Sequence, residues 1–323
     1  MCGLSKLPLL RLFRSGTRHS SVGARPAHDH ELPAAVRLVL ASSGTVSEEQ
    51  VREFVDLAKS GSPEAGGVWV GVRDEQLVTA AVPVVNPGRT MLLLVPARSS
   101  DELFVDLTRM AIEAACQHAA SAGVVLAQAL VEPRDPKLIG LFKSCSFQRL
   151  SELIYLQSSI GRHMALPDLP PGHHWVQYST ASHARFAQTI LRAYENSLDC
   201  PGLNGLRDIE DIIAGHRATG EFDPSRWVLL CHGEAPVGVL LLSAVPRGEA
   251  LEVVYLGLVP EARGRGLGSL LMRQAAAVAS AAQLRLTLAV DADNLPALKL
   301  YWHHGMQSIC RKLALLRDLR SAG

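Results

Sequence analysis

Two stretches of this chain carry the same residue pattern, 159 residues apart. Residues 135–147 align without a gap on residues 294–306, and the same spacing aligns the strand-like run 69–72 with 228–231. An ungapped match of this kind indicates that both halves have one fold. At 323 residues the chain is long enough for two domains of ordinary size, so we expect two copies of one domain.

A glycine-rich turn in the second copy joins a strand-like run, 251–258, to an amphipathic helical run, 270–282. Gly264, Gly266 and Gly268 stand at alternate positions in this turn. The first amides of a helix have no partner inside it, and glycines let an anion approach them, so the turn suits a pyrophosphate. The dinucleotide pattern G-x-G-x-x-G and the G-K-[ST] of a nucleotide P-loop are absent. An ordinary tight turn is the alternative.

Two motifs together resemble the GNAT superfamily of N-acyltransferases. The pattern Arg-x-x-Gly-x-Gly at 263–268 is similar to the family's coenzyme A pyrophosphate loop, and residues 294–306 are similar to its signature N-x-x-A-x-x-L-Y-x-x-x-G-[FM]. The resemblance covers about residues 174–318. It implies an α/β (mixed α+β) chain of two tandem GNAT-fold domains, each with a central mixed, mostly antiparallel sheet flanked by helices. The tandem architecture is similar to that of the mycothiol synthases.

These patterns divide the chain into four segments. Residues 1–33 are predicted to be a disordered or leader segment, because the first 28 are basic and contain no acid. Residues 34–160 would form a degenerate GNAT-like domain, residues 161–172 a proline-containing linker, and residues 173–323 the catalytic domain. The cysteines form no C-x-x-C pair, so we expect a reducing cytoplasmic location, with an organelle as the alternative.

The first copy lacks features on which coenzyme binding would depend. Residues 104–109 stand opposite the glycine turn and contain no glycine, and Phe142 replaces Tyr301. The second copy is expected to carry about twenty extra residues, approximately 196–215, that the first copy lacks. The first copy is therefore predicted to be structural, in a monomer with pseudo-dimeric domain pairing or in a homodimer.

The resemblance implies a set of residues that bind acetyl-CoA as co-substrate. They are Leu258, Val259, Arg263, Gly264, Arg265, Gly266, Leu267, Gly268, Ser269 and Asn294. Amides of a bulged strand near Leu258 and Val259 would hold the pantetheine arm and polarise the carbonyl. The side chains of Arg263 and Arg265 could pair with phosphate or remain solvated. Asn294 is also a good N-cap for the helix that follows it.

Two residues are predicted to carry the chemistry. Tyr301 matches the position where GNAT enzymes keep a tyrosine near the coenzyme sulfur. The pKa of a thiol is about 8.5 and that of tyrosine about 10, so a hydrogen-bond donor describes Tyr301 better than a full proton donor. The alternative is a core tyrosine with a satisfied hydroxyl. Glu252 lies eleven residues before Arg263, where histone-acetylating members place the base, but it could instead face solvent.

Other polar residues are predicted to serve the acceptor. Tyr194, Glu195 and Asp199 lie where the GNAT fold lines the acceptor side of the cleft. The two acids are rival bases, ligands for a cationic substrate, or ordinary surface acids. No metal is predicted, because the side chains of the adjacent pairs 173–174 and 303–304 diverge.

The expected function is that of an acyl-CoA-dependent N-acyltransferase. It would transfer acetyl from acetyl-CoA to a primary amine of a small molecule or peptide, by direct attack in a ternary complex. The alternative is a non-catalytic acyl-CoA-binding regulatory module. The net charge of +1 argues against a nucleic-acid partner. No apolar run approaches the roughly 20 residues of a membrane helix, so no membrane partner is expected.

Overall fold

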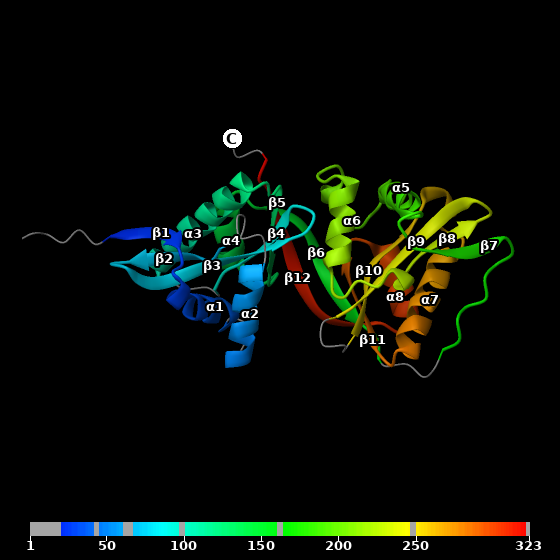
Figure 1. The fold of residues 1–323 in the computed structure, drawn as a ribbon, viewed down its shortest axis with the longest axis horizontal. Helices are drawn as coiled ribbons and strands as arrows, with labels where there is room; N and C mark the ends of the chain where they lie inside the picture. Colours follow the sequence, from blue (N-terminus) through cyan, green and yellow to red (C-terminus); the bar gives the residue numbers. More distant parts are fainter. Residues whose placement is uncertain are drawn as a thin grey trace, which may run out of the picture.

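The structure is a computed structural model that describes residues 21–41, 45–60, 67–96, 101–159, 164–245 and 250–320. In these residues the strands form a single 12-stranded mixed sheet with helices on both faces (Figure 1), which confirms the predicted α/β class and tandem plan. None of the helices in the described ranges has the length and apolar character needed to span a bilayer.

Both copies contain the same succession of elements. The first copy has β1 (Val22–Pro26), α1 (Leu32–Leu40), α2 (Glu48–Ser60), β2 (Trp69–Arg73), β3 (Gln76–Asn86), β4 (Thr90–Leu94), α3 (Glu102–Ser121), β5 (Leu126–Val131), α4 (Pro136–Ser144) and β6 (Gln148–Gln157). The second copy has β7 (His173–Gln177), α5 (His183–Tyr194), α6 (Ile209–Ala218), β8 (Trp227–His232), β9 (Ala235–Ala244), β10 (Ala250–Leu258), α7 (Leu267–Ala281), β11 (Arg285–Asp291), α8 (Leu295–His303) and β12 (Gln307–Asp318).

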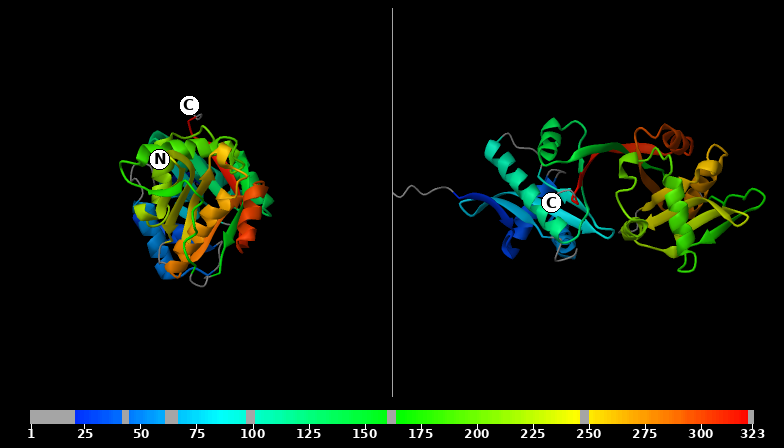
Figure 2. Two further views of the ribbon diagram at one scale, coloured as in Figure 1. Left: turned by 90° about the vertical axis from the view of Figure 1, so that its right-hand side faces the viewer. Right: turned by 90° about the horizontal axis from the view of Figure 1, so that it is seen from above.

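The two copies exchange their last strands. The sheet order is β1-β2-β3-β4-β5-β12-β6-β11-β10-β9-β8-β7, so β12 pairs with β5 of the first copy and β6 pairs with β11 of the second. Seen from above, β6 and β12 bridge the two lobes (Figure 2). Leu313 and Leu315 of β12 are buried in the core of the first copy. Each copy therefore completes the other, and the sheet continues across the predicted boundary at 161–172.

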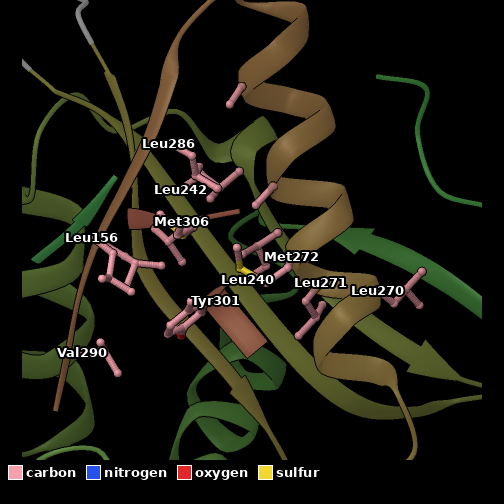
Figure 3. Close-up of a cluster of buried hydrophobic side chains, with 14 of the residues drawn as sticks. Leu156, Leu240, Leu242, Leu270, Leu271, Met272, Leu286, Val290, Tyr301 and Met306 are labelled. Carbon is pink, nitrogen blue, oxygen red and sulfur yellow. The ribbon is translucent and has the colours of Figure 1, made fainter. Parts of the chain in front are cut away.

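Helices pack on opposite faces of the second copy. α7 and α8 cover one face over a core that includes Leu240, Leu271 and Leu286 (Figure 3). α5 and α6 cover the other face, where Phe186 and Trp227 are fully buried. Burying each such side chain stabilises the fold by about 1.5–3 kcal/mol. The two layers fix the positions of β10 and β11 between them.

The first copy begins earlier than predicted. Residues 1–20 of the predicted leader lie outside the described residues, but Val22–Pro26 form β1, which pairs antiparallel with β2. This part of the prediction for residues 1–33 is wrong. The strand is a short edge strand with a glycine and a proline, so it has no alternating pattern to reveal it. An ion pair between Arg25 and Glu31, 2.8 Å apart, ties it to the start of α1.

The expected insertion in the second copy is smaller than predicted. α2 of the first copy and α6 of the second occupy the same place in the element order, so the helix at 209–218 is not extra. The additional residues are confined to the connection 195–208, which corresponds to the shorter connection 41–47 in the first copy. α2 has apolar residues at helical spacing, at Val51, Phe54 and Val55, so its sequence carries the pattern of an amphipathic helix.

Candidate active site

A gap opens between two parallel strands of the second copy. β10 and β11 pair only at 250–252 with 285–287 and then diverge. A cavity of about 480 Å³ fills the gap and is lined by residues of both strands, the turn 263–269, α8 and the loop 196–199. Beyond Glu252, the edge of β10 that faces β11 has no ladder partner there, so its main-chain groups are available to a ligand.

A β-bulge lies on β10 beside this gap. The register between β10 and β9 shifts between Val253 and Tyr255, which places the extra residue at Val254. The strand that was expected to be bulged does carry a bulge, which lies four residues before Leu258. The Val259 amide donates to the Val237 oxygen at 3.1 Å and is not free.

The glycine turn closes one end of the cavity. Gly264 and Gly266 have φ of 73° and 77°, a left-handed conformation that favours glycine. Gly266 is the N-cap of α7, and a Cβ added at Gly264 or Gly266 would meet no atom within 4 Å. The space in front of these residues is thus open, and the first amides of α7 face outward without helix partners. A nearby anion gains about 0.3–1 kcal/mol from the helix dipole.

The cavity brings together most of the predicted site residues. Those that line it are Asp199, Leu258, Arg263, Gly264, Gly266, Gly268, Ser269, Asn294 and Tyr301. Val259 and Leu267 are instead buried in the apolar core, at 3% and 8% exposed. Arg265 and Glu195 are exposed and do not line it, and Tyr194 and Glu252 also lie outside the lining.

The Arg263 side chain is engaged by the protein itself. Its Nη2 atom donates to the main-chain oxygens of Ala193 and Glu195 at 2.9 and 2.8 Å. Nη1 donates to the oxygen of Asn196 at 3.2 Å, and Nε to that of Leu258 at 3.2 Å. The first three of these carbonyls lie at and beyond the end of α5, where carbonyls lack helix partners, and the Leu258 carbonyl lies at the end of β10. The guanidinium therefore holds the turn against α5 and is not available as a separate phosphate ligand.

Tyr301 lies at the boundary between core and cavity. It is 7% exposed, and its ring lies in the core cluster with Leu156, Val290 and Met306 (Figure 3). Within the described residues its hydroxyl has no hydrogen-bond partner, and it is not among the fully enclosed polar atoms, so the oxygen opens to the cavity. Burial raises the pKa of Tyr301 above its usual value, and the carboxylate of Asp199 raises it further.

Asn294 is the N-cap of α8, as expected. Its Oδ1 atom accepts from the Ala297 amide at 3.3 Å, and Pro296 follows in the first turn. The cap fixes the start of the helix that carries Tyr301. Asn294 also lines the cavity, so both parts of the prediction are compatible with the geometry.

Glu252 lies where β10 and β11 part. It is the last residue of β10 paired with β11, opposite Thr287. Its neighbours Leu251 and Val253 belong to the core under α7, so the carboxylate is on the face that α5 and α6 cover. It is half-buried, and burial raises its pKa. Its charge also acts on Tyr155 of β6, which is a residue of the first copy.

The loop after α5 is anchored to β11. The Asp291 amide donates to Asp199 Oδ1 at 3.3 Å, and the Cys200 amide donates to Asp291 Oδ2 at 3.0 Å. These bonds hold Asp199 at the cavity, where burial raises its pKa. Burial also raises the pKa of the Cys200 thiol to about 12, so it is not a thiolate nucleophile at neutral pH.

Several residues at the site were not predicted. Ser269 Oγ lies 2.8 Å from His304 Nε2, which links the glycine turn to the end of α8. Tyr255 is buried, with its ring centroid 5.2 Å from that of Tyr194. His304 adjoins the second motif and could have been noticed there. Tyr255 looks like any strand aromatic, and only the folded arrangement places it beside the bulge.

No group of three or more His, Cys, Asp or Glu side chains in the part of the chain that the structure describes could hold a metal ion.

Residues 192–306 match the family model described as Acetyltransferase (GNAT) family. Over 70 residues the chain is 40% identical to the mycothiol acetyltransferase of Jonesia denitrificans. That match covers 21% of this chain and 22% of the length of the relative.

Solved structures share the architecture of the whole chain. A GCN5-related N-acetyltransferase from Sphaerobacter thermophilus has a TM-score of 0.64 at 15% identity, covering 92% of this chain and 96% of that one. A tandem GNAT protein from the clavulanic acid biosynthesis pathway has a TM-score of 0.55 at 17% identity, covering 93% and 98%. At identities this low, the structural similarity shows a common fold and nothing more.

Proposed function

We propose that the second copy transfers acetyl from acetyl-CoA to a primary amine, because residues 192–306 match the model of the GNAT acetyltransferase family. The acceptor would be a small molecule or a peptide. The observation that carries the proposal is the cavity between β10 and β11, which ends at left-handed glycines and the start of α7. An open cradle of this kind fits a diphosphate.

Bound acetyl-CoA would supply an activated thioester, and this chain's residues would position it. The diphosphate would contact the amides that begin α7, and the pantetheine arm would follow the unpaired edge of β10. The arm would leave the thioester near Val254, where the bulge interrupts the regular ladder. Main-chain amides aimed at the carbonyl oxygen would stabilise the charge that develops there.

Glu252 is proposed as the base for the acceptor amine. Its carboxylate lies on the face toward α5 and α6, at the point where the gap begins. The amine nitrogen would form the new bond to the acetyl carbon as the carbon–sulfur bond breaks, and its proton would pass to Glu252. A carboxylate with a raised pKa is better matched to this task near neutral pH.

Tyr301 is proposed as the hydrogen-bond donor to the departing sulfur. Its hydroxyl opens to the cavity, while the ring is held by the core under α7. The raised pKa of Tyr301 makes transfer of its proton to a thiolate still more unfavourable than for ordinary tyrosine. Donation without full transfer is therefore the role that fits, and solvent would supply the proton in the end.

The first copy is proposed to be structural. Residues 104–109, which align with the glycine turn, lie inside α3, and the N-cap of this helix is Asp101, which accepts from the Leu103 amide at 2.9 Å. A carboxylate already occupies the helix start where the diphosphate would lie, and Phe142 stands in place of Tyr301. We propose a first module from about residue 22 to 160 and a catalytic module at 173–323, joined by the exchanged strands.

Calorimetry and turnover together test this function. Titrating coenzyme A into the full chain should give saturable binding with one site. Acetyl-CoA and a panel of primary amines should then release free thiol in an amine-dependent way. Binding without turnover on any amine would favour the alternative of a regulatory acyl-CoA sensor. An absence of coenzyme A binding by folded protein would refute both.

A further inference from the structure

A second polar cavity lies at the junction of the two copies, apart from the coenzyme cavity. Its volume is about 320 Å³. The first copy contributes Asn86, Pro87, Thr90 and Gln128, and the second copy contributes Arg207, Ile212, Gly215, His216, Ala218 and Thr219. No acidic side chain lines it. The cavity exists only because the two copies meet there.

The contact that forms this junction is specific. The turn between β3 and β4 reaches α6 in both views (Figures 1 and 2), and Arg89 Nε donates to Asp211 Oδ2 at 2.8 Å. Arg89 also pairs with Asp208 at 2.9 Å. A Cβ at Gly88 would collide with the main-chain oxygen of Asp211, so the backbones are in close contact. Asp208 and Asp211, which are sequence neighbours of the lining residues Arg207 and Ile212, are thus already paired with Arg89.

Arg207 is the unusual member of this cavity. It is half-buried, and its Nε is enclosed without a hydrogen-bond partner among the described residues. No hydrogen bond or ion pair of its guanidinium is found within those ranges. Its Nη1 atom packs beside α6, 3.6 Å from where a Cβ of Gly215 would be. A half-buried guanidinium whose enclosed Nε has no partner is unfavourable for the fold and requires an explanation.

The walls around Arg207 are neutral hydrogen-bonding groups. The side chains of Thr90 and Gln128 make no hydrogen bond within the described residues, although Thr90 is only 8% exposed. Burial and the Arg207 charge lower the pKa of His216 to about 4, so His216 is neutral at physiological pH. The residues that line the cavity around Arg207 are therefore uncharged, and the carboxylate that acts on Arg207 electrostatically, that of Asp211, is already paired with Arg89. This arrangement recognises a small planar anion.

We propose that this junction cavity binds a carboxylate group, held by the guanidinium of Arg207 and the side chains of Thr90 and Gln128. A guanidinium presents parallel N–H groups that match the two oxygens of a carboxylate. The carboxylate belongs either to the acceptor amine or to a separate small molecule. The proposal goes beyond acetyl transfer and stands whether or not the chain turns over acetyl-CoA.

The first test uses stability in place of activity. The full chain is unfolded thermally in increasing sodium acetate, with sodium chloride at equal ionic strength as the reference. Acetate should raise the unfolding midpoint of the wild type in a saturable manner, as a ligand of the native state does. In Arg207→Met the acetate-dependent rise should be lost. Arg134→Met, which removes an exposed arginine, is the matched control and should behave as the wild type.

The second measurement keeps the test decisive if acetate binds weakly. With chloride as the only anion, Arg207→Met should unfold at a midpoint equal to or above that of the wild type, because it removes a buried charge without a partner. A lower midpoint would show that Arg207 stabilises the fold directly and would overturn the proposal. An equal acetate response in wild type and Arg207→Met would also overturn it.

Two acetyl acceptors, one with a carboxylate and one without, distinguish the two possible sources of the bound carboxylate. β-Alanine and ethylamine are compared as acetyl acceptors for wild type and Arg207→Met. A KM for β-alanine raised at least tenfold, with that for ethylamine unchanged, would assign the carboxylate to the acceptor. If the KM for β-alanine were the same in wild type and Arg207→Met, while acetate still stabilised the wild type, the carboxylate would be assigned to a separate ligand.

Discussion

Leu156 and Leu315 occupy equivalent positions in the two repeats, and each is fully buried in the core of the opposite copy. Leu156 of β6 belongs to the cluster beneath α7, and Leu315 of β12 belongs to the cluster beneath α3. The 159-residue spacing between them is that of the repeat. The exchange of strands therefore couples the stability of the coenzyme cavity to a strand of the first copy.

Leu315→Ala and Leu156→Ala should each destabilise the copy that lies opposite their own in the sequence. Each is expected to destabilise the chain by about 2–5 kcal/mol, because a buried leucine leaves a cavity. Leu315→Ala should reduce amide protection in α3 and β5, and Leu156→Ala should reduce it in α7 and β11. Hydrogen exchange with peptide resolution measures both. If Leu315→Ala affected mainly α7 and β11, the strand exchange would be contradicted.

Arg263→Met should destabilise the fold, and it should not remove a phosphate-binding charge, because the guanidinium is engaged by main-chain oxygens. Its guanidinium donates to three main-chain oxygens around the end of α5 and to one at the end of β10, so its loss should lower the free energy of unfolding by about 1.5–3 kcal/mol. Urea unfolding measures the change. Arg265→Met, two residues later and exposed, is the matched control and should change stability by no more than about 0.5 kcal/mol. Equal effects of the two would argue against the anchoring role.

Gly266→Asp should weaken coenzyme A binding. The new carboxylate would stand at the start of α7, where the diphosphate is proposed to lie, and a loss of affinity of about tenfold or more is expected. Gly233 also has positive φ and open space around a Cβ, in the β8–β9 turn. Gly233→Asp therefore carries similar backbone strain away from the cavity and should bind normally in calorimetry. Normal binding by Gly266→Asp would place the diphosphate elsewhere.

Tyr301→Phe should slow acetyl transfer by about 10²–10⁴-fold while leaving coenzyme A affinity nearly unchanged. The first copy has Phe142 at the equivalent position, also buried, so the fold accommodates the ring without its hydroxyl. Because the pKa of Tyr301 is raised, the wild-type rate should not fall as the pH passes 9 through ionisation of this residue. Steady-state kinetics of both proteins measures the effect. An unchanged kcat in Tyr301→Phe would show that the hydroxyl takes no part in acetyl transfer and that Tyr301 is a structural core residue.

The sequence predicted the local features of the site well because they depend on neighbours along the chain. The glycine turn, the N-cap at Asn294 and the helix that carries Tyr301 all follow from short motifs with a physical cause. The fate of the Arg263 side chain could not be predicted in the same way. Its partners are carbonyls about seventy residues earlier, and a motif does not show which groups a fold brings to it.

The strand exchange and the junction cavity also required the folded chain. An alternating strand such as β12 specifies which face is buried but not which strand it pairs with. The repeat indicated two similar folds and left open whether each keeps its own last strand. Arg207 belongs to no motif in the sequence, because the cavity that contains it forms only where the β3–β4 turn meets the second copy. Sequence patterns of this kind therefore predict modules better than the contacts between modules.

Glu252→Gln should stabilise the protein at neutral pH while lowering its activity. Burial raises the pKa of Glu252, so the folded state binds a proton more tightly than the unfolded state does. Below the unfolded pKa, near 4.5, both states are protonated and ionisation of Glu252 has no effect on stability. As the pH rises toward and past the raised folded pKa, the wild type loses stability that the glutamine variant keeps.

The same ionisation should shape the rate. Acetyl transfer by the wild type should increase with pH as Glu252 loses its proton, and this limb should be absent in Glu252→Gln. Urea unfolding and kcat/KM are measured for both proteins between pH 4 and pH 8. Thr287→Val, opposite Glu252 on β11, alters the same strand pair without a titrating group and serves as the control. A glutamine variant that keeps the wild-type pH profile, even if more stable, would leave Glu252 as a buried acid and assign the base to another residue, with Asp199 as the first candidate.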